Sequence, residues 1–133
     1  MRHQRQPTKT SCGPTVVAIL LGLRAEMIIR RLWKVRTAAR RKLQTERTNV
    51  GELRRLLGHA GLTLGKRTRN VPRVAIVRVD HAVGRGWHWS LKSDRWIFDP
   101  AYARSSRAAS YLKMFSGRIS FYEITDGDTG RPE

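Results

Sequence analysis

A single cysteine near the start of the chain has the setting of a catalytic nucleophile. Cys12 lies in the segment QPTKTSCGPTVVAILLG, residues 6–22, directly before Gly-Pro and a run of apolar residues. A helix beginning here would place the thiol at its N-terminal end, where the helix dipole and free backbone N–H groups favour a thiolate. The same N–H groups could stabilise the oxyanion that forms when a thiolate attacks a carbonyl. The segment therefore indicates thiol-based acyl transfer, against the alternative that Cys12 is a small core side chain.

A catalytic thiol also needs a base, and the chain offers four histidines. His3 lies in the irregular start of the chain, His59 in a helical segment among leucines, and His81 at the end of a predicted strand. His88 is favoured, because the segment around it, WHWSLKSDRWIFDP at residues 87–100, is typical of a β-hairpin that supplies it with a partner.

The predicted register of this hairpin places a carboxylate opposite His88. With a turn about residues 93–94, His88 lies directly across from Asp99, and cross-strand Cβ atoms are roughly 4.5–5.5 Å apart. A carboxylate in that position orients the imidazole and stabilises its cation. The register rests on two apolar pairs on the other face, namely Leu91 with Trp96 and Trp89 with Phe98.

A second oxyanion donor could come from the lead-in segment. Gln6 lies six residues before Cys12, and its amide would reach the site if residues 1–11 fold back beside the helix. Gln4 is a weaker candidate for the same role. Each residue alone has an ordinary structural explanation, so the prediction rests on their combination. This chemistry uses no metal ion and no cofactor, and we expect none.

Helices are predicted to position the thiol in the first half of the chain. Residues 14–23 are apolar on every face, which predicts a central buried helix with Gly13 as its N-cap and a proline at its first helical position. A further helix over 49–61 opens with Asn49 and Glu52, a pair typical of a capping box.

Between these two lies a predicted amphipathic helix over residues 25–43. Its apolar stripe recurs at helical spacing and consists of Ile28, Leu32, Val35, Ala39 and Leu43. Its outer face is predicted to be basic and includes Arg30, Arg31, Arg36, Arg40, Arg41 and Lys42.

The second half of the chain changes to the alternation of strands. Strands and one short helix are predicted over residues 74–79, 87–92, 95–99, 106–114 (the helix) and 119–124. The fold class is therefore α+β, with N-terminal helices, one of them central and buried, packed on a C-terminal antiparallel sheet. We expect a single domain over residues 1–124 and a flexible tail over 125–133.

The charge of the chain predicts an acidic partner. There are 27 Lys and Arg residues against 10 Asp and Glu, a net charge of +17. The basic helix from Arg30 to Lys42 could contact nucleic acid or another acidic molecule, and the alternative is a solvated basic surface. A lone cysteine excludes an internal disulfide, and no apolar run reaches the roughly 18 residues of a membrane span. The first apolar run lacks a signal-peptide cleavage site, so we expect a reducing, cytoplasmic location.

The motifs together resemble one known family. These are Q-x5-C-G-P at the start, T-x3-E-L-x3-L-x3-G from Thr48 to Gly61, then H-W, D-P-A and a late F-S-G. The set resembles the papain-like cysteine peptidases of the bacteriocin-processing type, which cut double-glycine leader peptides. The resemblance implies a papain-like fold and peptide-bond hydrolysis through a thioester. It also implies Cys12 as nucleophile, His88 as general base and acid, Asp99 as orienting carboxylate and Gln6 as oxyanion donor.

Two features of the chain depart from that family and leave the substrate open. Ser11 precedes the cysteine where many relatives carry Asp, and the second helix is unusually rich in arginine. Two other functions therefore stand beside the peptidase. One is a papain-like acyltransferase or glutamine deamidase of the toxin type. The other is a nucleic-acid-binding basic module in which the triad is inactive.

Overall fold

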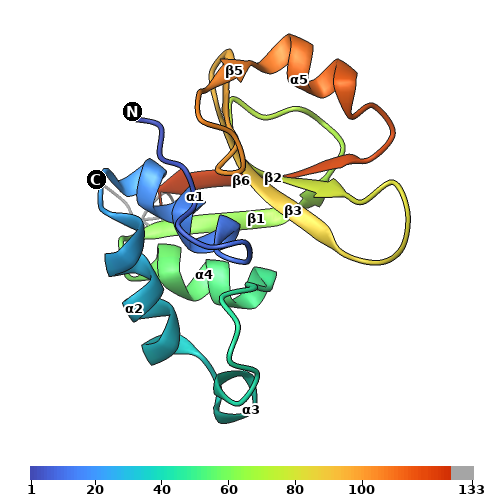
Figure 1. Cartoon of the computed structure of the whole chain (residues 1–133). Helices are drawn as coiled ribbons and strands as arrows, with labels where there is room; N and C mark the ends of the chain where they lie inside the picture. Colours follow the sequence, from blue (N-terminus) through green and yellow to red (C-terminus); the bar gives the residue numbers. More distant parts are fainter. Residues whose placement is uncertain (127–133) are drawn as a thin grey trace.

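The chain folds into helices packed on an antiparallel sheet, and the computed structural model describes residues 1–126 (Figure 1). The helices of this part are α1 (Cys12–Leu21), α2 (Ala25–Val35), α3 (Ala38–Arg41), α4 (Val50–Gly58) and α5 (Ala108–Met114). The strands are β1 (Leu62–Thr68), β2 (Val74–Asp80), β3 (Trp87–Ser93), β4 (Trp96–Phe98), β5 (Ser106–Arg107) and β6 (Ile119–Asp126). The predicted α+β class is confirmed at this level.

The six described strands form one sheet in the order β1-β6-β2-β3-β4-β5, and every neighbouring pair is antiparallel. Side chains alternate between its faces along β2, so Ile76 joins the core beneath α1, α2 and α4, while Val77 joins a smaller core with α5. Figure 1 shows α1, α2 and α4 together on one side of the sheet and α5 apart from them. The sheet is therefore covered on both faces.

Helix α1 lies at the centre of the larger core, as its apolar composition predicts. Residues 13–19 are all buried, and the helix packs against α2, α4 and β3. Its start differs from the prediction, because Ser11 is the N-cap and Cys12 is the first helical residue, instead of Gly13 and Pro14. Pro14 falls within the first turn, where backbone N–H groups have no partner inside the helix, so its missing N–H costs little there.

The predicted helix over residues 25–43 is wrong in its second half. Helix α2 ends at Val35, the backbone of Arg36 is extended, and α3 begins after Thr37. Arg36 is only 2% exposed, so it does not belong to the basic outer face. Its guanidinium donates to buried Glu52 at 2.6 Å, and both side chains are fully buried. A buried carboxylate requires such a partner. Forming this ion pair therefore ends the helix at Val35, although the apolar stripe continues beyond it.

Helix α4 begins with the predicted capping box. The Asn49 side chain accepts from the Glu52 backbone N–H at 2.8 Å, and the Glu52 carboxylate accepts from the Asn49 N–H at 3.0 Å. Glu52 also accepts from Arg40, which keeps its pKa below the usual range although burial alone would raise it. The helix ends at Gly58, three residues before the predicted stop at Gly61.

The hairpin of β3 and β4 exists, but its predicted register is wrong by two residues. Leu91 pairs with Phe98 and Ser93 with Trp96, so Asp94 and Arg95 form the turn. Asp94 has a φ of 52°, which a tight two-residue turn accommodates. Trp96 is 41% exposed, so it does not form the predicted buried pair with Leu91.

The first and last strands of the sheet, β1 and β6, include residues that were not predicted to be in strands. Strand β1 was not predicted, because the segment LTLGKRT carries few of the apolar residues that mark a strand. Strand β6 continues through Thr125 and Asp126, which belong to the predicted tail. The rest of that tail, residues 127–133, lies outside the described residues.

Helices α1 and α2 are the segments whose length and hydropathy bear on a membrane. Within residues 1–126, no single helix has the length and hydropathy needed to cross one. The two helices together pass the same test of length and composition, with a bend of 116° between them.

Candidate active site

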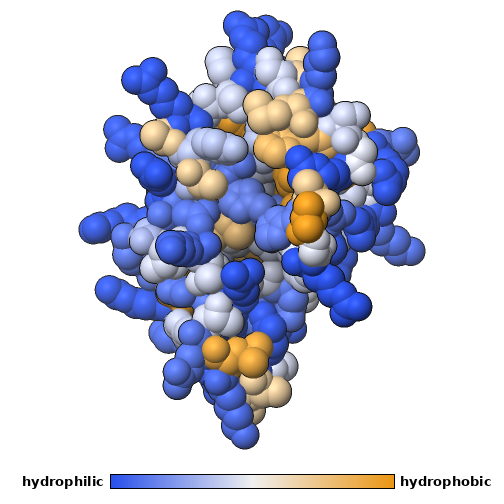
Figure 2. All heavy atoms as spheres, turned by 45° about the vertical axis from the view of Figure 1, so that its right-hand side comes forward, coloured by the Kyte–Doolittle hydropathy of each residue, from blue (hydrophilic) through white to orange (hydrophobic). Residues whose placement is uncertain are grey.

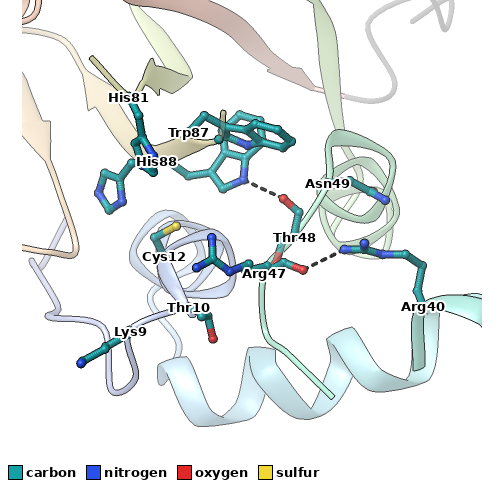
Figure 3. Close-up of a pocket in the computed structure, with 12 residues that line it drawn as sticks. Lys9, Thr10, Cys12, Arg40, Arg47, Thr48, Asn49, His81, Trp87 and His88 are labelled. Atoms are coloured by element: carbon teal, nitrogen blue, oxygen red, sulfur yellow. Dashed lines mark hydrogen bonds between the residues drawn. The ribbon is translucent and has the colours of Figure 1, made fainter. Parts of the chain in front are cut away.

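A pocket of about 340 Å³ opens at the N-terminal end of α1. It contains two of the predicted catalytic residues, Cys12 and His88. Figure 3 shows the Cys12 side chain, His81 and His88 at one end of the pocket, and Thr48, Asn49 and Arg40 at the other. The complete lining consists of Lys9, Thr10, Cys12, Arg40, Arg47, Thr48, Asn49, His81, Gly86, Trp87, His88 and Trp89.

The Cys12 thiol is partly exposed at the first residue of α1. Its neighbour Gly13 permits the wall of the pocket to approach the helix. A Cβ on Gly13 would lie 2.7 Å from Thr48 Cβ and 2.8 Å from Thr48 Oγ1, closer than packed atoms tolerate. Glycine in the Cys-Gly pair therefore allows the segment before α4 to pass directly over the helix start.

His88 and Asp99 form a hydrogen bond between Nε2 and Oδ1. The register error does not separate them, because a shift of two residues keeps Asp99 on the same face of the hairpin, diagonal to His88 instead of opposite. With Nε2 bound to Asp99, Nδ1 is the ring nitrogen that remains for the thiol. The structure thus brings together three of the predicted site residues.

The electrostatics of this group favour an imidazolium. Burial acts to lower the pKa of His88, but the hydrogen bond to Asp99 and the adjacent Cys12 outweigh it and raise the pKa to about 10. An imidazolium next to a cysteine stabilises a thiolate and can later protonate a leaving group.

Asp99 is held by three donors and is only 3% exposed. Its carboxylate accepts from His88, from the Ala101 backbone N–H at 2.9 Å and from the Tyr111 hydroxyl at 2.6 Å. Burial acts to raise the pKa of Asp99, and these bonds outweigh it, so the pKa lies below its usual value. Burial and the Asp99 charge raise the pKa of Tyr111, which keeps its proton for this bond.

Tyr111 was not predicted as a site residue. It comes from α5, which packs on the face of the sheet opposite α1. A tyrosine in a short amphipathic helix is an ordinary core residue, so only the fold reveals its contact with Asp99.

Gln6 does not line the pocket. The lead-in does fold back, since the Gln6 backbone N–H donates to the Pro100 carbonyl at 2.8 Å. However, the side-chain Nε2 donates to the carbonyls of Thr8 and Lys9 at 2.9 and 3.1 Å, which uses both of its hydrogens. In this structure Gln6 fixes the turn before Cys12, and its role as an oxyanion donor stays a prediction.

The other candidates from the sequence fall into two groups. Gln4 lies between α1 and α2, where it accepts from the Ala25 backbone N–H at 3.2 Å. His3 bonds the Tyr102 carbonyl at 2.8 Å, and His59 is exposed at the end of α4. These three side chains lie outside the pocket, whereas His81 is on its rim.

Compared with known proteins, the chain matches no family model, and no curated protein is significantly similar to it.

Proposed function

We propose that this chain is a thiol-dependent peptidase with a papain-like fold, in which Cys12, His88 and Asp99 form the catalytic triad. The observation that carries the proposal is the alignment of three groups: a partly exposed thiol at a helix N-terminus, an imidazole next to it, and a buried carboxylate on the far ring nitrogen. The motif resemblance and the α+β fold support the same function. The reaction needs no metal ion or cofactor.

The proposed reaction has two steps. The Cys12 thiolate attacks the peptide carbonyl carbon, and the backbone N–H of Cys12 at the helix start donates to the resulting oxyanion. The C–N bond breaks as the His88 imidazolium gives its proton to the leaving amine, which leaves a thioester on Cys12. Water then attacks the thioester while neutral His88 accepts its proton, and this step releases the carboxylic acid and restores the Cys12 thiolate beside the His88 imidazolium.

Mass spectrometry of a peptide library tests this function. Incubation in ¹⁸O-labelled water is expected to yield peptides with one labelled oxygen in a new C-terminal carboxylate. Cys12→Ala is expected to lose this activity by at least about a thousandfold, and His88→Ala by roughly a hundredfold or more. Products joined to another amine, or a glutamine changed to glutamate without chain cleavage, would indicate acyl transfer or deamidation instead.

A second candidate function is binding of nucleic acid through the outer face of α2 and α3. Five cationic side chains are exposed there, and only Glu26 of α2 is acidic. They are Arg30, Arg31, Lys34, Arg41 and Lys42. Phosphate contacts by these side chains would make the affinity fall steeply with salt. This face is separate from the pocket, so both activities can belong to one molecule.

A further inference from the structure

The pocket next to Cys12 has a cationic wall. Lys9, Arg40 and Arg47 all line it, and none of its lining residues in the described part of the chain is Asp or Glu. Figure 3 shows Arg47 between Cys12 and Thr48, with Lys9 on the side of the lead-in. A concave site with one sign of charge attracts a group of the opposite sign.

Two of these cations have no anionic partner among the residues that the structure describes. The Arg40 guanidinium is occupied, since it donates to Glu52 at 3.0 Å and to the Arg47 carbonyl at 2.9 Å. Within residues 1–126, the side chains of Lys9 and Arg47 form no ion pair. Their charges are therefore available to a bound molecule.

The carboxylates near the pocket do not cancel this charge. Glu46 does not line the pocket, and its carboxylate, with a single negative charge, accepts from the Thr10 hydroxyl at 3.0 Å. Glu52 is shared by Arg36 and Arg40, so that group as a whole carries one positive charge. Asp99 is paired with the His88 imidazolium. The balance of charges around the thiol is thus positive.

Both available cations project from backbone that the fold holds in place. The Arg47 carbonyl accepts from Arg36 and Arg40, and the next carbonyl, that of Thr48, accepts from Trp89 Nε1 at 2.8 Å. On the other side, the Lys9 carbonyl accepts from Gln6. The backbone positions of the two cations relative to Cys12 are therefore built into the fold, even though both side chains are exposed.

We infer that the substrate carries an aspartate or glutamate within two residues of the bond that is cut, and that its carboxylate lies between Lys9 and Arg47. This inference rests on the proposed peptidase function. An extended peptide rises about 3.3 Å per residue, so a side chain one or two positions from a carbonyl over Cys12 reaches the wall of this pocket. It also gives Gln6 a positioning role through Lys9.

Matched peptides test the inference on turnover. Each pair carries glutamate or its neutral isostere glutamine at one position beside a small-residue cleavage site. For one position we expect kcat/KM to be about tenfold higher with glutamate at low salt, and this ratio to shrink as salt screens the charges.

Arg47→Gln and Lys9→Gln should each lower the ratio by about threefold to tenfold. Arg30→Gln, an exposed residue on α2, is the control that leaves the ratio unchanged. Equal rates at every position, or a preference for lysine, would overturn the inference.

Alkylation of Cys12 separates this inference from the peptidase proposal, because it requires no turnover. Iodoacetate and iodoacetamide react by the same displacement of iodide, but only iodoacetate is an anion. The rate ratio of iodoacetate to iodoacetamide should fall at least threefold when Lys9→Gln and Arg47→Gln are combined, and should not change in Arg30→Gln. An unchanged ratio in the double variant overturns the inference even if peptides are cut. A lowered ratio without any peptide cleavage supports the anion site and contradicts the peptidase proposal.

Discussion

At the scale of single residues, the site depends on hydrogen bonds that tie buried groups to the thiol. Asp99 could be predicted from its place in the hairpin, since its face relative to His88 follows from strand alternation. Tyr111 could not be predicted, because its contact with Asp99 depends on how α5 packs against the sheet. No spacing in the sequence encodes that contact.

Tyr111→Phe is expected to weaken the site without removing any predicted triad member. The variant leaves one oxygen of buried Asp99 without a donor, so we expect a loss of about 1–3 kcal/mol in the free energy of unfolding. The pKa of Asp99 should rise, and kcat/KM should fall more steeply as the solution becomes acidic. Urea unfolding and a pH profile of kcat/KM measure both effects. Tyr102→Phe, at an exposed tyrosine, should change neither; equal behaviour of the two variants would contradict the role of Tyr111.

The raised pKa of His88 predicts how stability depends on pH. Burial opposes the imidazolium, but Asp99 and Cys12 favour it enough to raise the pKa from 6.5 to about 10. The folded protein therefore binds this proton more tightly than the unfolded chain does. This contribution to stability is complete below about pH 6.5 and is lost as the pH rises toward about 10. In His88→Gln, the free energy of unfolding should no longer fall between about pH 6.5 and pH 10 on account of this group. An NMR titration that places the pKa of His88 near its ordinary value would contradict the predicted arrangement.

At the scale of elements, the site is formed by α1, the segment before α4 and the β3–β4 hairpin. The buried helix and the capping box were predictable, because both depend on local patterns of apolar and capping residues. The break after Val35 was not, since it depends on Arg36 reaching a carboxylate sixteen residues away. The hairpin register was also missed, because an exposed Trp96 was assigned to the core.

Gly13→Ala is expected to disturb the pocket, although alanine is the better helix former. The added Cβ would overlap Thr48, so the wall must move away from α1, at a cost of about 1–3 kcal/mol in the free energy of unfolding. Gly58→Ala in α4 is the matched control, because nothing lies within 4 Å of the added Cβ there. That variant should stabilise the fold by roughly 0.5–1 kcal/mol. Thermal unfolding measures the stability of both variants. If both were stabilised, or both destabilised, the close approach of Thr48 to Gly13 would be contradicted.

Glu52→Gln tests the buried ion pair that anchors the Arg47 segment. The change leaves the fully buried Arg36 charge without its partner, so we expect a loss of about 3–5 kcal/mol in the free energy of unfolding. Glu26→Gln on the surface of α2 should change it by less than about 1 kcal/mol, because its contact with Arg24 is long and exposed. Similar losses in both variants, measured by urea unfolding, would contradict the anchoring role.

At the scale of the whole molecule, the net charge of +17 is carried on a surface that is mostly hydrophilic. Figure 2 shows one face, where hydrophobic side chains occur in separate small groups among polar ones. Composition predicted this surface and helical spacing predicted a basic outer face over residues 30–42, but neither predicted a cationic pocket at Cys12. The location of the exposed positive charge depends on which arginines are buried or paired: Arg36 is buried, and Arg40 pairs with Glu52.

Binding to a nucleic acid duplex tests the outer face separately from the pocket. Replacing Arg30, Arg31 and Lys34 by Gln should reduce the slope of log affinity against log salt by about three, if each contacts one phosphate. A control that replaces Arg95, Arg104 and Lys113, which are exposed elsewhere, should leave the slope nearly unchanged. Equal losses in the two variants would assign the binding to net charge alone.

The proposed function requires that Cys12, His88 and Asp99 act as one activated thiol site. The most direct test is the rate of Cys12 alkylation by iodoacetamide between pH 5 and 10, compared with a free thiol of similar size. We predict that the wild-type protein reacts at least about tenfold faster than the free thiol at pH 6, and that His88→Ala loses this advantage. A wild-type rate that follows the free thiol across the whole range, with no change in His88→Ala, would contradict the account.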